Sequence, residues 1–194
     1  VGKYQNEVSK EACKSCPSGR YNTDQLKIVE EHDSLEDCKL CEDGQYLAST
    51  GQSGCNHCDP GQYENEKGQV ACKECLPGTH NQNSNGKDIS ECKACVAGTY
   101  ADQAGLVNCK NCVAGLYGVQ TGASGVDTCL FCAAGYFSTY SGSDACLPCA
   151  LGMYMSDSLR LETPPKRTCL SCPTATTEAS TTCEGCDAGK FGEM

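Results

Sequence analysis

Twenty cysteines, every one of them in a Cys-x-x-Cys pair, are the feature that most limits how this chain of 194 residues can fold. Cysteine at about a tenth of a chain is typical of a disulfide scaffold. The hydrophobic content of 39% includes these cysteines, and the chain has no Trp and only three Phe. A single large hydrophobic core is therefore not expected. The pairs begin at residues 13, 38, 55, 72, 92, 109, 129, 146, 169 and 183.

A common phrase follows the second cysteine of most pairs, Cys-x-x-Gly-x-aromatic, as in Cys41 to Tyr46. The most frequent spacing of the pairs is 17 residues, which indicates a repeat array. The glycine is typical of a turn with positive φ, and the aromatic ring would cover the disulfide. A second glycine four residues before the next pair indicates the turn of a hairpin. These second glycines are Gly51, Gly68, Gly105, Gly125 and Gly142.

The fold class that these patterns predict is small and disulfide-rich, an elongated tandem array of short β-hairpin repeats with little regular secondary structure and no helical core. Composition divides the chain into four segments. Gly2 and Tyr4 repeat the common phrase, and Cys186 begins another unit, so we expect a window on a longer array. The segments are 1–12, the end of a truncated repeat; 13–91, acidic repeats; 92–168, low-charge repeats; and 169–194, a divergent Ser/Thr-rich repeat with the start of the next.

Three chemistries use Cys-x-x-Cys pairs, and their contexts differ. A redox site needs one pair at a helix start, which ten similar pairs do not fit. Structural zinc could join two pairs in a four-thiolate site and stays the alternative. Disulfides are favoured, because a cysteine-dense chain with little hydrophobic content is typical of an oxidising compartment. We therefore expect no metal and no cofactor. Two pairings remain open on spacing alone: neighbouring pairs joined in sequence, or crossed bridges within five modules of four cysteines.

The repeated phrase resembles the ephrin-receptor-like cysteine-rich repeat and the shortest module of the tumour-necrosis-factor-receptor ectodomain. The resemblance is clearest from Cys41 to Tyr154, and phrases such as Gly98 to Gly105 are most similar to protist versions, for example components of flagellar hairs (mastigonemes). In the receptor module the bridge joins neighbouring pairs. The resemblance therefore implies Cys16–Cys38, Cys41–Cys55, Cys58–Cys72, Cys75–Cys92, Cys95–Cys109, Cys112–Cys129, Cys132–Cys146, Cys149–Cys169 and Cys172–Cys183, with Cys13 and Cys186 bonded outside the window.

The charge of the chain limits its partners. The net charge of -10 is unfavourable for binding nucleic acid. The longest apolar run, Cys129–Phe137, is too short to insert in a membrane. Residues 96–159 carry only five charged side chains and more apolar residues than a thin array can bury, so we expect contact with copies of the chain or with other filament or surface chains. The alternative is that these residues thicken the local cores. The candidate assembly residues are Leu116, Phe131, Tyr136, Tyr140, Leu147 and Met153.

The segment between Cys172 and Cys183 has six hydroxyl residues among ten, a composition that in a secreted protein is typical of O-glycan acceptors and equally of a plain solvated loop. No catalytic constellation is present, so an enzyme is not expected. The sequence predicts an extracellular or cell-surface location and a structural role: a disulfide-stapled rod in a filament or surface protein. The alternative is a receptor or adhesion ectodomain that binds a protein ligand. The candidate glycosylation residues are Thr174, Thr176, Thr177, Ser180, Thr181 and Thr182.

Overall fold

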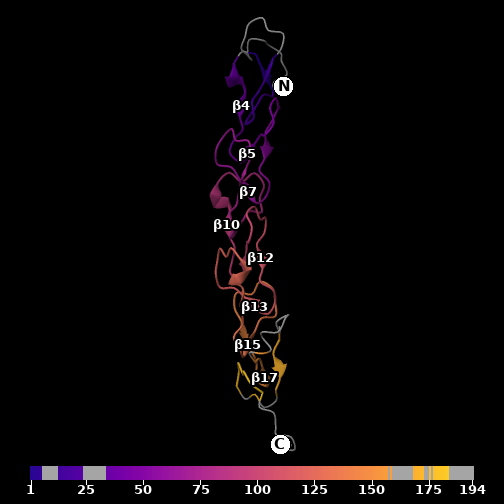
Figure 1. Ribbon diagram of the computed structural model, residues 1–194, viewed down its shortest axis with the longest axis vertical. Helices are drawn as coiled ribbons and strands as arrows, with labels where there is room; N and C mark the ends of the chain where they lie inside the picture. The colour runs from indigo at the N-terminus through magenta and orange to yellow at the C-terminus, as the bar shows by residue number, and fades with distance from the viewer. Residues whose placement is uncertain are drawn as a thin grey trace, which may run out of the picture. The chain divides into compact units, whose positions relative to one another are not determined.

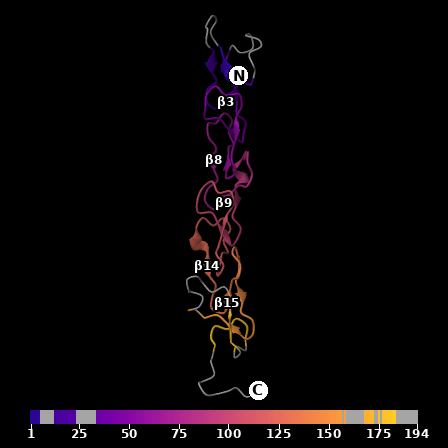
Figure 2. The ribbon, with the colours of Figure 1, turned by 90° about the vertical axis from the view of Figure 1, so that its right-hand side faces the viewer.

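The computed structural model describes residues 1–5, 13–23, 34–156, 158, 168–172, 175 and 177–183. The chain forms two compact units, which we call unit 1 and unit 2. Unit 1 consists of Val1–Lys93 with Gln103–Asn108, and unit 2 of Ala94–Asp102 with Cys109–Met194. In Figures 1 and 2 the hairpins within each unit follow one another in chain order.

Each described strand is two residues long, and the strands pair antiparallel in nine two-stranded sheets. The predicted fold class, a disulfide-rich array of short hairpins with little regular structure, is confirmed. Four hairpins lie in unit 1: β1 (Lys3–Tyr4) with β2 (Lys14–Ser15), β3 (Arg20–Tyr21) with β4 (Lys39–Leu40), β5 (Gln45–Tyr46) with β6 (Asn56–His57), and β7 (Gln62–Tyr63) with β8 (Lys73–Glu74). β9 (Thr79–His80) pairs with β10 (Lys93–Ala94). Unit 2 holds β11 (Thr99–Tyr100) with β12 (Lys110–Asn111), β13 (Leu116–Tyr117) with β14 (Leu130–Phe131), β15 (Tyr136–Phe137) with β16 (Leu147–Pro148), and β17 (Met153–Tyr154) with β18 (Leu170–Ser171).

The Gly-x-aromatic phrase and the next Cys-x-x-Cys pair provide the two strands of one hairpin. The residues after the glycine form the first strand, and the two residues between the paired cysteines form the second. In β3–β4, Arg20 lies opposite Leu40 and Tyr21 opposite Lys39. The Cys41 N–H then donates to the Gly19 carbonyl at 3.0 Å and closes the hairpin. The strands are short because a cysteine stands at both ends of the second one.

Disulfides join the second cysteine of each pair to the first cysteine of the next. These are the nine bridges that the receptor-type resemblance implies: Cys16–Cys38, Cys41–Cys55, Cys58–Cys72, Cys75–Cys92, Cys95–Cys109, Cys112–Cys129, Cys132–Cys146, Cys149–Cys169 and Cys172–Cys183. Cys13 has no disulfide partner among the described cysteines, and Cys186 lies outside the described residues. In the entropy model each closed loop of about 15 residues destabilises the unfolded chain by about 3 kcal/mol. We name each repeat by the cysteine that opens its loop.

Recurring backbone hydrogen bonds join consecutive repeats, and two kinds of them hold the glycine and the opening cysteine. The N–H of the glycine after the opening cysteine donates to a carbonyl in the next repeat, as from Gly19 to Leu47 at 2.8 Å and from Gly44 to Glu64 at 2.8 Å. In the opposite direction, the N–H of a turn residue donates to the backbone carbonyl of the opening cysteine in the preceding repeat, as from Gly68 to Cys41 at 2.8 Å. The opening cysteines from Cys16 to Cys112 are therefore held both by a disulfide and by the following repeat.

The same glycine also approaches the repeat after next. Gly61 has φ +87, and a Cβ at this position would overlap the carbonyl of Gly105. Gly19, with φ +77, meets the carbonyl of Gly68 in the same way. The positive φ predicted from the phrase is confirmed, and the close backbone approach is a second reason for glycine. Within each unit the contacts thus reach two repeats along the chain.

The turn residue with positive φ lies ten residues after the opening cysteine in the repeats from Cys41 to Cys132. Four of the five predicted turn glycines occupy it: Gly51, Gly68, Gly105 and Gly142. The prediction for Gly125 is wrong, because its φ is -161 and Gly122, at +67, makes the turn instead. Asn85 takes the same position in the Cys75 repeat at φ +61, a conformation that asparagine tolerates better than most residues.

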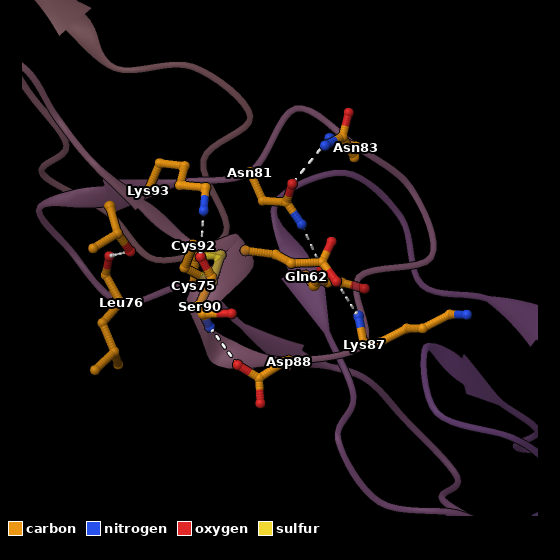
Figure 3. Close-up of a disulfide and its surroundings, with 12 residues drawn as sticks. Gln62, Cys75, Leu76, Asn81, Asn83, Lys87, Asp88, Ser90, Cys92 and Lys93 are labelled. Atoms are coloured by element: carbon orange, nitrogen blue, oxygen red, sulfur yellow. Dashed lines mark hydrogen bonds between the residues drawn. A yellow bond between two sulfur atoms is a disulfide. The ribbon is translucent and has the colours of Figure 1, made fainter.

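Single turns of 3-10 helix account for the longer loops. The cysteines of the Cys75 and Cys112 loops are 17 residues apart, three more than in the loops with a separation of 14. These two longer loops contain η3 (Ile89–Glu91) and η4 (Val126–Thr128). A third such turn, η2 (Leu35–Asp37), precedes Cys38. Figure 3 shows η3 beside the Cys75–Cys92 bridge, where the Asp88 carboxylate accepts from the Ser90 N–H at 2.8 Å. This hydrogen bond lowers the pKa of Asp88 and caps the turn.

The core of the described residues consists mainly of opening cysteines and of the residue that directly follows the aromatic position. The aromatic residues at this position in the described repeats are half-buried, so they contribute less to the core than the opening cysteines do. The buried residue after them lies against the preceding repeat, as Gly118 does beside Gly98. This core position holds Asn22, Leu47, Glu64, Asn81, Ala101, Gly118, Ser138 and Met155.

Glu64 is the one charged residue at this core position and is 1% exposed. Its carboxylate accepts from the Lys73 ammonium at 3.0 Å and from the Glu66 N–H at 3.1 Å. The hydrogen bond to Glu64 raises the pKa of Lys73. Lys73 also donates to Asn65 Oδ1 at 2.7 Å, so its ammonium has a partner besides the buried carboxylate. The buried charge is therefore paired and fully hydrogen-bonded.

Non-reducing peptide mapping of the oxidised chain tests the pairing. We expect proteolytic fragments in which Cys58 is linked to Cys72, and the equivalent link in each other repeat, because these cysteines lie at Cα distances of 5.5 to 5.8 Å. Fragments linking Cys55 to Cys72 and Cys58 to Cys75 would establish the crossed pairing and contradict the structure.

Gly61→Ala tests the close approach between repeats two apart. We expect a loss of about 1–3 kcal/mol in the free energy of unfolding, because alanine is strained at φ +87 and its Cβ meets the Gly105 carbonyl. Gly54→Ala is the matched control, since no φ strain and no atom within 4 Å oppose a Cβ there. Guanidinium unfolding of the oxidised variants measures the difference, and equal midpoints would refute the packing role.

Glu64→Leu and Glu64→Ala separate core filling from charge pairing. Leu47 occupies the equivalent position in the previous repeat, so we expect leucine at 64 to keep the stability within about 1 kcal/mol. Alanine removes both the acceptor and the volume, and we expect it to cost about 1–3 kcal/mol. Thermal unfolding is the measurement. A leucine variant that unfolds as easily as the alanine variant would show that the carboxylate itself is required.

Candidate assembly surface

Apolar side chains occupy both faces of three successive hairpins in unit 2. Directly opposite residues of antiparallel strands point to the same face, so each pair acts as one patch. Leu116 lies opposite Phe131, and Tyr117 opposite Leu130. In the next hairpin Tyr136 lies opposite Pro148, and Phe137 opposite Leu147. In the third, Met153 lies opposite Ser171, and Tyr154 opposite Leu170.

The equivalent pairs in unit 1 are polar or mixed. Gln62 lies opposite Glu74, and Gln45 opposite His57. The aromatic residue of these hairpins lies opposite a lysine or an asparagine, as Tyr63 does opposite Lys73. The hairpin geometry is the same in both units, so the change from polar to apolar pairs is a property of the residues alone. It gives unit 2 an apolar surface that the backbone does not require.

The six predicted assembly residues lie on or beside these hairpins. Leu116 is half-buried and packs in the pair with Phe131, whereas the other five are exposed. Tyr136 and Leu147 belong to neighbouring pairs of one hairpin, and Met153 lies on a separate one. Tyr140 is 76% exposed in the loop between β15 and β16. The alternative of thicker local cores thus fits Leu116 better than the exposed residues, which stay assembly candidates.

A hollow of about 250 Å³ lies on this surface. Its wall is mostly apolar, and Asp144 is the one charged residue in it. Sequence analysis named Tyr136 but missed the other lining residues. These residues are brought together by the register between the Cys112 and Cys132 repeats, and both repeats contribute to the wall of the hollow. The lining residues are Tyr117, Val119, Ala133, Tyr136, Asp144, Ala145 and Cys146.

Few charges surround the hollow. Asp102 and Lys110 form an ion pair at 2.6 Å, and the hydrogen bond from Lys110 lowers the pKa of Asp102. This pair neutralises two of the five charged residues between positions 96 and 159 and leaves three aspartates. Residues 1–95 carry 16 acidic and 10 basic side chains. The apolar hairpins are therefore the part of the chain with the fewest charges to desolvate on contact.

The predicted glycosylation residues lie in the Cys172 repeat. Thr177, Thr181 and Thr182 are exposed. Ser180 is half-buried, and its hydroxyl donates to the Thr177 carbonyl at 2.6 Å. Thr174 and Thr176 lie outside the described residues. Glycosylation stays a prediction, for which the three exposed threonines are the most accessible acceptors.

Comparison with known proteins supports the repeat type. Residues 44–92 and 84–129 match the family model described as tyrosine-protein kinase ephrin type A/B receptor-like. Residues 44–129 thus match two copies of the ephrin-receptor-like cysteine-rich repeat, a type of module without a catalytic domain. No curated protein matches the chain. The matched repeats and the many disulfides together suggest an extracellular location. Within the described part of the chain, no helix has the length and apolar character needed to cross a membrane.

Proposed function

We propose that this chain is a structural repeat segment of an extracellular filament or cell-surface protein, which assembles with other chains through unit 2. The observation that carries this proposal is the apolar pairs on successive hairpins, in which Leu130, Phe131 and Leu147 are exposed and the residues opposite them are half-buried. Exposed apolar surface of this kind is typical of contact sites between proteins. The partners would be copies of this chain or other chains of the same filament or surface layer.

The construction of the repeats supports a mechanical role. The described loops are closed covalently, and most opening cysteines accept a hydrogen bond from the next repeat, as Cys41 does from Gly68. Such a segment holds its form without a large core, and it resists unfolding as long as its disulfides stay oxidised. This suits a load-bearing or scaffolding part outside the cell.

A receptor or adhesion ectodomain is the second candidate. It is favoured by the description of the matched family, which names a receptor. In that case the apolar hairpins of unit 2 would bind a protein ligand instead of the neighbouring chain of an assembly. The two candidates share the location and differ in what covers the surface.

Immunogold labelling of intact, unpermeabilised producing cells tests the proposal. We expect antibodies raised against the oxidised chain to label regularly spaced positions along filaments or a surface layer. Labelling scattered over the plasma membrane would favour the receptor candidate. Labelling that appears only after permeabilisation would place the protein inside the cell and overturn both candidates. Antibodies preadsorbed with the purified chain are the control for specificity.

A further inference from the structure

Tyr140 projects from the same loop that forms part of the hollow. It is the most exposed large hydrophobic residue in the described part of the chain. Tyr136 and Asp144, four residues before and after it, both line the hollow, whereas Tyr140 does not. One short loop therefore presents an unburied aromatic ring beside an unfilled apolar hollow.

The backbone of this loop is held by local hydrogen bonds. The Tyr140 carbonyl accepts from the Ser143 hydroxyl at 2.9 Å and from the Ser138 hydroxyl at 3.3 Å. The buried Ser138 hydroxyl is also 2.8 Å from the Ser143 hydroxyl. These contacts fix the base of the projecting side chain, so little conformational entropy would be lost in the backbone when the ring is bound.

We propose that two copies of this chain form a two-fold symmetric pair in which Tyr140 of each copy fills the hollow of the other. This proposal rests on the proposed function and names the partner of its surface. Because Tyr140 and part of the hollow belong to one loop, a two-fold axis at that loop would bring each ring to the other hollow and close the pair. The hollow is open to solvent and has a volume of about 250 Å³, so a ring from a second copy can reach its apolar wall from outside.

Chemistry and charge favour a second copy as the occupant. The phenol O–H of Tyr140 is a donor, and Asp144 is the one carboxylate in the hollow that could accept from it. Two chains of net charge -10 repel each other over most of their surface. The repulsion is least at the low-charge hairpins of unit 2, where ring and hollow are found. A strongly basic partner would be attracted instead to the acidic residues of the first half.

Sedimentation velocity of the whole oxidised chain, over a range of concentrations, tests the pair. We expect the unchanged chain to dimerise and Tyr140→Ala to weaken the dimer by on the order of 30-fold, as for a central aromatic contact. Tyr140→Phe keeps the ring and loses the donor, so we expect a smaller effect of roughly several-fold. Leu76→Ala removes another exposed apolar residue, in unit 1, and should leave the dimer unchanged.

A mixing experiment separates this geometry from general apolar adhesion. Ala133 is exposed at the rim of the hollow, so Ala133→Trp should fill the hollow without disturbing the core, and it should also abolish dimerisation. Copies with Tyr140→Ala keep the hollow, and copies with Ala133→Trp keep the ring. We expect a mixture of the two to form a heterodimer with one of the two contacts.

Three results would overturn the pair. The first is an unchanged chain that stays monomeric at about 100 μM, a concentration at which even a weak dimer would form. The others are a Tyr140→Ala dimer as tight as that of the unchanged chain, and no association in the mixture. Filament or surface labelling could persist in each of these cases, and then the proposed function would stand with another contact surface. Non-reducing peptide maps of all variants show whether the disulfides, and with them the fold, are intact.

Discussion

Covalent closure of short loops is the constraint on which the rest of this structure depends. The bridges span 11 to 22 residues and take the place of a hydrophobic core, and the opening cysteines are themselves among the most buried residues. Closure of a loop also determines which part of its backbone another repeat can contact. Only because Cys58 and Cys72 hold their loop in place does Gly61 meet the Gly105 carbonyl. Packing between repeats is thus a consequence of the crosslinks more than an independent source of stability.

The contacts between repeats differ from those of most repeat proteins. In a simple solenoid each repeat touches its immediate neighbours, and the stability is close to a sum of nearest-neighbour terms. Here hydrogen bonds join consecutive repeats, while the glycine after the opening cysteine packs on the repeat after next. A defect in one repeat therefore affects two others in its unit, and unfolding of the units should be more cooperative than their small hairpins suggest.

Much of the fold could be predicted from the sequence, because cysteine spacing and the Gly-x-aromatic phrase are strictly local signals. The role of Gly122 in place of Gly125 was missed because the spacing was measured back from the next pair, whereas the distance of ten residues from the opening cysteine is the constant one. The buried position of Glu64 was missed for a related reason: a glutamate in an acidic chain gives no sign of burial. At the assembly surface, composition indicated the residues, but the hollow depends on register between repeats.

The constant position of the turn residue has a consequence for how such chains vary. In the repeats whose loops are fully described, the opening cysteine and the eleven residues that follow it make the recurring backbone hydrogen bonds with neighbouring repeats, and the extra residues of η3 and η4 come after these residues. Length can change there without altering the architecture on either side. This makes the stretch between turn and closing cysteine a natural place for evolution to add new epitopes, and for an experimenter to insert a tag or a fluorophore.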